Sequence, residues 1–148
     1  MSILDKTYSG TTIKQLNIKE LNILCDEIRD QIFTTVEKNG GHLSPNLGSV
    51  ELIVALHYVF DIPSDKLIFD VGHQSYAHKI LTGRLNEFSS IRKKGGLSGF
   101  PDPAESQADA FIAGHAGTSI SAGLGFCRSR DFLKDDYYVV NLVGDASF

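Results

Sequence analysis

The sequence predicts an α/β fold with a mainly parallel sheet flanked by helices. Residues 66–71 (KLIFDV) and 137–143 (YYVVNLV) are apolar, β-prone runs of the length of buried strands, and segments with helical spacing of apolar residues lie before and between them. Each run leads into a polar motif that contains glycine, DVGH or VGDA. Because open α/β sheets bind ligands at the carboxyl ends of their strands, both motifs are candidate site segments.

Composition and charge limit the class of protein. The chain has 148 residues, of which 42% are hydrophobic, enough for one domain, or part of one, with a sizeable core. The formal net charge is −4 and the longest basic cluster is RKK at residues 92–94, which argues against a nucleic-acid partner. Cys25 and Cys127 stand far apart in segments of helical pattern, so we expect buried free thiols rather than a disulfide or a cysteine metal site.

Targeting and membrane segments are not recognisable in the sequence. The first ten residues, MSILDKTYSG, lack a basic region followed by a long apolar core, and no run of about eighteen apolar residues occurs. We therefore expect a cytoplasmic protein with no membrane partner.

The first helix is predicted from Asn17 to the glycine pair at residues 40–41. Asn17 can act as N-cap, and Glu20 three residues later can complete a capping box. Apolar residues then recur at three- and four-residue spacing as one stripe, and glycine allows the left-handed backbone that ends a helix. The stripe consists of Leu21, Leu24, Cys25, Ile28, Ile32 and Val36.

The remaining elements follow in order. A second helix is predicted over residues 49–60, with His57 packed or on the surface rather than functional. After the first strand, residues 75–84 have helix-compatible spacing and a glycine stop at Gly83. Residues 95–109 are rich in Gly, Pro and Ser and predict a long ordered loop of the kind that is usually functional or mobile. A helix that opens on small residues follows within residues 115–130, and the second strand comes after it.

Four polar clusters follow glycines at the ends of these elements. A histidine after a glycine in a loop is usually structural, but the repetition of the pattern predicts one shared cleft. No His-x-x-x-His or comparable spacing is present, so a closed zinc site is not indicated. A single aspartate at a strand end suits Mg²⁺, with phosphate bound at a nearby helix N-terminus. The clusters contain His42, then Asp70, His73 and Gln74, then His115, Thr118 and Ser119, and finally Asp145 and Ser147.

Longer motifs carry a resemblance to a known family. The run from GGHLSPNLG at residues 40–48 to DVGHQSYAHKILTGR at residues 70–84, followed by GGLSGFP, GHAGTSISAGLG and VGDAS, resembles the amino-terminal region of 1-deoxy-D-xylulose-5-phosphate synthases. The resemblance covers the chain from about residue 16 onward. It implies part of a transketolase-like, thiamin diphosphate-binding domain, with residues 1–148 as the amino-terminal part and the remaining domains absent. It also implies thiamin diphosphate and Mg²⁺ as cofactors, and pyruvate and D-glyceraldehyde 3-phosphate as substrates.

The implied activity is that of a transferase. Enzymes of the family condense the two substrates with release of CO₂, and the product feeds non-mevalonate isoprenoid, thiamin and pyridoxal synthesis. The resemblance suggests a homodimer of complete chains. It implies that His42 lies near the reactive carbon of the cofactor, that His73 donates to the diphosphate and that Asp145 binds Mg²⁺. The cofactor-binding set that it implies comprises His73, Gly114, His115, Ala116, Gly117, Ser119, Asp145, Ala146 and Ser147.

The chain departs from the family pattern in three respects. It has GHAGTS where GHSSTS is common, which removes hydroxyls at Ala116 and Gly117, and GDAS where GDG is common. In the family, an asparagine downstream of the GDG motif completes the cofactor-binding signature, a glutamate activates the aminopyrimidine ring of the cofactor, and basic residues hold the aldehyde phosphate. These residues belong to later parts of the family's chains and are absent here. We therefore expect this chain alone to be inactive. Two alternatives stay open: the amino-terminal subunit of a split transketolase-like enzyme, and a non-catalytic phosphate-binding fragment.

Overall fold

The computed structural model describes residues 2–8 and 12–147, and the side chains of Tyr8 and Ala146 lie outside what it describes. The chain divides into two units. Unit 1 comprises Met1–Val59 and Gln74–Gly99, and unit 2 comprises Phe60–His73 and Phe100–Phe148. The chain thus leaves unit 1 after residue 59, forms the first strand in unit 2 and returns directly after His73.

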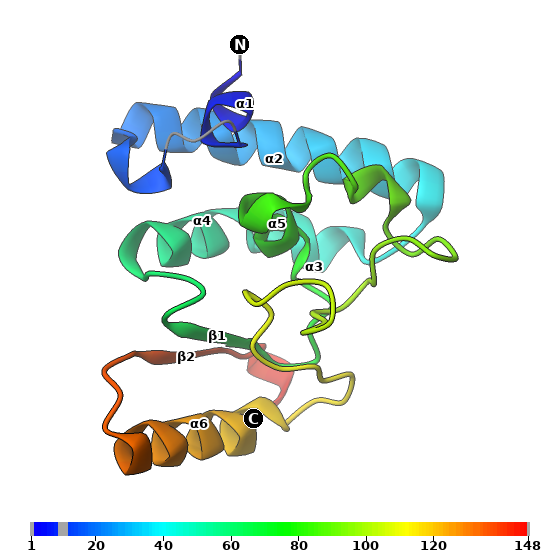
Figure 1. Cartoon of the computed structure of the whole chain (residues 1–148). Helices are drawn as coiled ribbons and strands as arrows, with labels where there is room; N and C mark the ends of the chain where they lie inside the picture. Colours follow the sequence, from blue (N-terminus) through cyan, green and yellow to red (C-terminus); the bar gives the residue numbers. More distant parts are fainter. Residues whose placement is uncertain (1, 9–11, 148) are drawn as a thin grey trace. The chain divides into compact units, whose positions relative to one another are not determined.

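Unit 1 is built around one long helix, α2 (Ile18–Asn39). Helices α1 (Ile3–Tyr8), α3 (Leu43–Gly48), α4 (Val50–Val59) and α5 (Tyr76–Lys79) pack against it (Figure 1). Shorter helical turns complete the unit: η1 (Ile13–Gln15), η2 (Ile80–Arg84) and η3 (Phe88–Ser90).

The predicted start and stripe of α2 are confirmed. The Asn17 side chain accepts the backbone N–H groups of Lys19 and Glu20, and the Glu20 carboxylate accepts the Asn17 N–H at 2.9 Å. The capping box therefore satisfies N–H groups that have no partner inside the helix. The stripe is buried except for Leu21, which is half-buried, and Thr35 joins it.

Replacing Asn17 by alanine is expected to lower the free energy of unfolding by about 1 kcal/mol, because the cap loses its acceptor. The matched control is Asn22→Ala, an exposed position inside the same helix, where alanine should be neutral or slightly stabilising. Urea unfolding of both variants measures the difference. Equal free energies for the two variants would contradict the assigned cap.

Unit 2 contains a parallel pair of strands, β1 (Lys66–Phe69) and β2 (Val139–Leu142), with Lys66 opposite Val139 and Phe69 opposite Leu142. Helix α6 (Ser119–Leu133) connects to β2 and packs along both strands (Figure 1), and the turn η4 (Asp145–Ser147) follows β2. This arrangement confirms an α/β fold with parallel strands. Neighbouring parallel strands need a crossover connection, which usually contains an α-helix.

Small residues allow α6 to lie close to the sheet. A Cβ atom built on Gly123 would lie 2.5 Å from Nδ2 of Asn141 in β2, so a larger residue at this point would require the Asn141 side chain to move.

The two cysteines differ in burial. Cys25 is buried, and burial raises the pKa of its thiol to about 11, whereas Cys127 on α6 is only half-buried, contrary to prediction. Its position on a helix turned partly to solvent explains the difference.

A carboxylate fixes the amino ends of both strands. Asp65, just before β1, accepts the Asp61 N–H at 2.7 Å and the Tyr138 N–H at 2.8 Å. The second of these bonds joins residues that are 73 positions apart and sets the register of β1 against β2. Sequence reasoning did not identify this residue.

The helices of unit 1 differ from the prediction in two places. Residues 43–48 form α3, which was not predicted because the stretch is short and contains a proline. The helix predicted over residues 75–84 consists of α5 and η2, and Thr82 and Gly83 lie outside helical backbone angles. Residues 95–109 contain neither helix nor strand, as predicted. In the part of the chain that the structure describes, no helix is long and apolar enough to cross a membrane.

Candidate cofactor-binding site

A strained turn joins β1 to His73. Val71 has φ 60°, and Gly72 has φ 91° and donates its N–H to the Asp70 carbonyl at 2.6 Å. A positive φ at a β-branched residue is costly, and such strain persists at sites where the surrounding structure requires it. At Gly72 a Cβ atom would lie 2.5 Å from Cδ of Pro101. Val71 and Gly72 therefore turn the chain away from the direction of β1 before His73, which is half-buried.

Asp70 holds the segment before α6. Its two carboxylate oxygens accept the N–H of Gly117 at 3.0 Å and the N–H of Ser119 at 3.2 Å. The Asp70 residue is only 1% exposed. Burial by itself raises the pKa of this carboxyl, but the hydrogen bonds from the Gly117 and Ser119 backbone and from the Ser147 hydroxyl outweigh burial and lower the pKa below its usual value. Asp70 is thus a hydrogen-bonded carboxylate at the end of β1 that holds the start of α6.

The loop before α6 presents an exposed surface. Gly114, His115, Ala116 and Gly117 are exposed, whereas Ser119 at the start of the helix is fully buried. The Thr118 hydroxyl donates to the His115 carbonyl at 3.1 Å, which closes a turn at this point. Among the predicted residues of this loop, four are thus accessible to a ligand and Ser119 is part of the packing.

Residues 145–147 lie at the same edge of the strand pair. The Asp70 N–H donates to the Leu142 carbonyl at 2.8 Å, so the carboxyl ends of β1 and β2 are adjacent. The Ser147 side chain is near enough to help lower the pKa of the Asp70 carboxyl, and Asp145 is exposed. Unit 2 therefore contains three of the four predicted clusters, at residues 70–73, 114–119 and 145–147. Gln74, which the sequence placed in the first of them, belongs to unit 1.

The fourth cluster, around His42, belongs to unit 1. Here a Cβ atom on Gly41, at φ 140°, would lie 2.8 Å from the Tyr76 hydroxyl oxygen. The side chain of Asn46 donates to the His42 carbonyl at 2.6 Å and accepts the Tyr76 N–H at 2.9 Å. Gly41 thus allows a close approach of the backbone to Tyr76, and His42 is half-buried. A cleft shared with unit 2 stays a prediction.

Comparison with known proteins decides the family. Residues 4–148 match the family described as 1-deoxy-D-xylulose-5-phosphate synthase. The chain belongs to this synthase family. Proteins named 1-deoxy-D-xylulose-5-phosphate synthase are similar to it: that of Dictyoglomus turgidum is 54% identical over 145 residues, and that of a Thermus thermophilus strain is 50% identical over 145 residues. In both cases the alignment covers 98% of this chain and 24% of the relative, so the chain spans about a quarter of the length of these synthases.

The side chains of the candidate site suit a Mg²⁺ ion that shares its ligands with phosphate and water better than a metal ion held by protein side chains alone. Among residues 2–8 and 12–147, no group of three or more His, Cys, Asp and Glu side chains is arranged to hold a metal ion. Asp145 supplies one exposed carboxylate, which fits an ion such as Mg²⁺ that also takes water and phosphate oxygens as ligands. The exposed loop at residues 114–117 fits a ligand that contacts backbone groups.

Sequence reasoning missed two residues that support the His42 segment. Asn46 and Tyr76 are fully buried. Asn46 joins α3 to α5 by accepting the Tyr76 N–H, and the Tyr76 ring packs edge-on against Phe88 with 5.9 Å between the ring centroids. The only signal in the sequence was an asparagine four residues after the histidine, a spacing at which side chains and carbonyls meet on one helix face.

His57 and His78 form a buried pair in unit 1. Nε2 of His57 lies 2.9 Å from Nδ1 of His78, and the two residues are 8% and 0% exposed. Burial, reinforced by the nearby His78, lowers the pKa of His57 to about 3. The expectation that His57 is packed rather than functional agrees with this geometry.

The His57 pair predicts a pH-dependent stability. A folded-state pKa below the unfolded value of 6.5 means that the unfolded chain binds the additional proton, so stability is full above about pH 6.5 and falls as the pH drops toward 3. Between pH 7.5 and 5.5 the loss is about 1.4 kcal/mol. His57→Gln, which can still bond His78, should remove most of this slope, whereas His115→Gln at an exposed position should keep it. Urea unfolding at both pH values measures the slope, and an unchanged slope in His57→Gln would refute the assignment.

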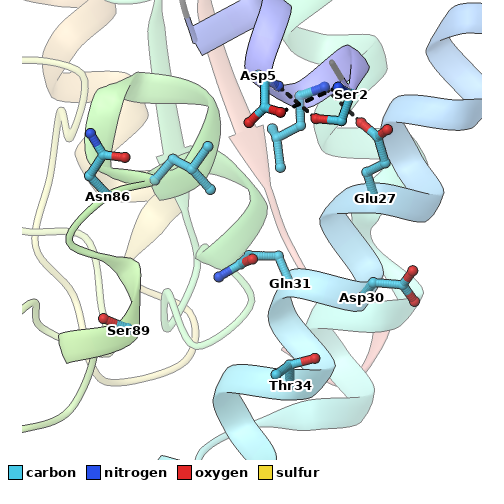
Figure 2. Close-up of a pocket in the computed structure, with 10 residues that line it drawn as sticks. Ser2, Asp5, Glu27, Asp30, Gln31, Thr34, Asn86 and Ser89 are labelled. Carbon is cyan, nitrogen blue, oxygen red and sulfur yellow. Dashed lines mark hydrogen bonds between the residues drawn. The ribbon is translucent and has the colours of Figure 1, made fainter.

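A pocket of about 550 Å³ lies in unit 1 between α1, α2 and residues 85–89 (Figure 2). Its lining includes Asp5, Glu27 and Asp30. The Glu27 carboxylate accepts the N–H groups of Ile3 and Leu4 at 3.2 and 2.7 Å, and Asp5 accepts the Ser2 N–H. Glu27 and Asp5 thus cap the short helix α1, and among the residues that the structure describes, none of the predicted site residues lines this pocket.

Proposed function

We propose that this chain is the amino-terminal part of a 1-deoxy-D-xylulose-5-phosphate synthase. The complete enzyme would condense pyruvate with D-glyceraldehyde 3-phosphate and release CO₂, and its product would feed isoprenoid, thiamin and pyridoxal synthesis. The observation that carries the proposal is the convergence of residues 70–73, 114–119 and 145–147 at the carboxyl edge of β1 and β2, in a chain about half identical to proteins of that name. This edge is where α/β sheets bind their ligands.

The proposed cofactors are thiamin diphosphate and Mg²⁺. Thiamin diphosphate, when bound, supplies the carbanion chemistry, and the protein supplies binding and orientation. Asp145 would bind Mg²⁺ through its carboxylate, and His73 would donate to diphosphate oxygens. His42 would act near the reactive carbon, in positioning or proton transfer. The accompanying cofactor contacts would come from Gly114, His115, Ala116, Gly117, Ala146 and Ser147. Ser119, which is fully buried, would hold the loop in place from the protein side.

The proposal includes the organisation of the complete protein. Residues 1–148 would form the amino-terminal part of the diphosphate-binding domain, and complete chains would act as a cytoplasmic homodimer. This chain alone would hold only part of a site, so it should bind the cofactor weakly and turn over negligibly.

The test is a calorimetric titration of thiamin diphosphate with Mg²⁺ into a completed synthase, in which residues 1–148 replace the matching 145 residues of the Dictyoglomus turgidum relative. We expect tight binding and pyruvate decarboxylation in the completed protein and weak binding to the 148-residue chain. ADP and inorganic diphosphate, each with Mg²⁺, are the ligand controls. Equal binding of all three ligands would favour a non-catalytic phosphate-binding fragment, and no binding by a folded, completed protein would exclude the thiamin proposal.

A further inference from the structure

We propose that Asp70 is a positioning residue that acts as a built-in anion at the N-terminus of α6. It occupies the N–H groups that a phosphate would otherwise take, and it thereby fixes the loop at residues 114–119 for a ligand held by other groups. This inference rests on the proposed cofactor, and in it Asp70 touches neither cofactor nor substrate.

The first argument is the geometry of the helix start. α6 has 15 residues, and its first N–H groups have no partner inside the helix and carry a partial positive charge. Such helix ends often bind phosphate. Here two N–H groups already donate to the Asp70 carboxylate: that of Ser119, the first residue of α6, and that of Gly117, two residues before it.

The second argument is electrostatic. Asp70 is 1% exposed and its carboxyl pKa is lowered, so the negative charge is kept at neutral pH despite burial. A diphosphate brought to the same N–H groups would meet this charge and be repelled. The helix N-terminus is therefore neutralised from within the chain. What remains for a ligand is the exposed part of the loop, residues 114–117, together with the half-buried His73 and the exposed Asp145.

The third argument is the covalent link to His73. Asp70 is three residues before His73, and the turn between them is strained at Val71 and closed by the Gly72 N–H. The Asp70 N–H is itself bound to the Leu142 carbonyl of β2. One residue therefore ties together the end of β1, the end of β2 and the start of α6, the three segments that carry the proposed cofactor contacts in unit 2.

The test uses the completed synthase defined above with Asp70→Asn. The asparagine keeps the size of the side chain but turns an NH₂ donor toward one of the two N–H groups, so one bond is lost and a repulsive contact appears. Asp65→Asn is the matched control, since Asp65 also accepts two backbone N–H groups but lies at the opposite end of β1. Both variants should lose stability. An effect on the loop or on cofactor binding that occurs only in Asp70→Asn therefore reports positioning and not a general loss of stability.

The measurements are hydrogen–deuterium exchange of the peptide containing residues 114–119 and steady-state kinetics with varied thiamin diphosphate. In Asp70→Asn we expect the Gly117 and Ser119 amides to exchange at least about tenfold faster, and the KM for the cofactor to rise about tenfold with kcat at saturation nearly unchanged. In Asp65→Asn both quantities should stay close to wild type.

The outcomes distinguish this inference from the proposed function. If the wild-type completed protein binds no thiamin diphosphate, the proposed function fails, and with it the role of Asp70 toward this cofactor. If the wild type binds it and Asp70→Asn matches Asp65→Asn in exchange and in KM, the positioning role is overturned while the proposed function stands. A loss confined to kcat would also overturn it, because it would place Asp70 in the chemistry.

Discussion

Asp145→Ala is expected to weaken Mg²⁺-dependent binding of thiamin diphosphate to the completed synthase by about 100-fold or more, because it removes a carboxylate ligand of the ion. Asp145 is exposed and lies three residues after the end of β2, near the edge where the strands β1 and β2 end. The protein should keep its stability, since the side chain is not part of the core. Calorimetric titration at fixed Mg²⁺, together with thermal unfolding, separates the two effects.

The matched control for this prediction is Asp136→Ala. Asp136 is an equally charged, exposed residue in the connection between α6 and β2, so its removal changes the net charge by the same amount. Its effect on binding should be less than about twofold, as expected for a screened surface charge. Similar affinities for Asp145→Ala and Asp136→Ala would show that Asp145 is not an ion ligand.

Gly72→Ala is expected to destabilise the protein by about 2–4 kcal/mol, since two costs combine at this position. An L-residue must adopt φ 91°, and its Cβ atom would lie 2.5 Å from Cδ of Pro101. The turn can relieve this contact only by shifting His73 or residues 100–101, so cofactor affinity should fall together with stability. Urea unfolding and cofactor titration of the completed protein measure both quantities.

Gly83→Ala separates the two costs. Gly83 has nearly the same backbone angle, φ 89°, but no atom lies within 4 Å of a Cβ built there. Its replacement should cost only about 1 kcal/mol, the cost of a left-handed conformation in a residue other than glycine. If Gly72→Ala is no worse than Gly83→Ala, the close approach of Pro101 does not constrain the turn.

The sequence predicted well wherever the signal lies between neighbouring residues. The capping box of α2 needs only Asn17 and Glu20, and the strands β1 and β2 follow from short β-prone runs. The stripe of α2 follows from a 3.6-residue period. The same local motifs, DVGH and VGDA, identified the segments that meet at the edge of the strand pair.

The sequence was least informative about short or interrupted elements. α3 is six residues long and was not predicted, and the helix after β1 breaks at Thr82 and Gly83. Short helices gain little from propensity and form because tertiary packing holds them. In α3 the buried Asn46 provides that packing by bonding the Tyr76 N–H of α5.

The amino-acid sequence by itself determined the α/β class, the main helix, the two strands and the polar segments of the candidate site, because periodicity, capping and strand-end motifs are local. Only the tertiary structure decided which groups those segments bring together. Asp70 bonds Gly117 and Ser119 across 47 and 49 residues, and His57 bonds His78 across 21. A carboxylate or an imidazole can accept hydrogen bonds from many donors. The tertiary fold determines the actual partners, because it places only a few donors within hydrogen-bonding distance.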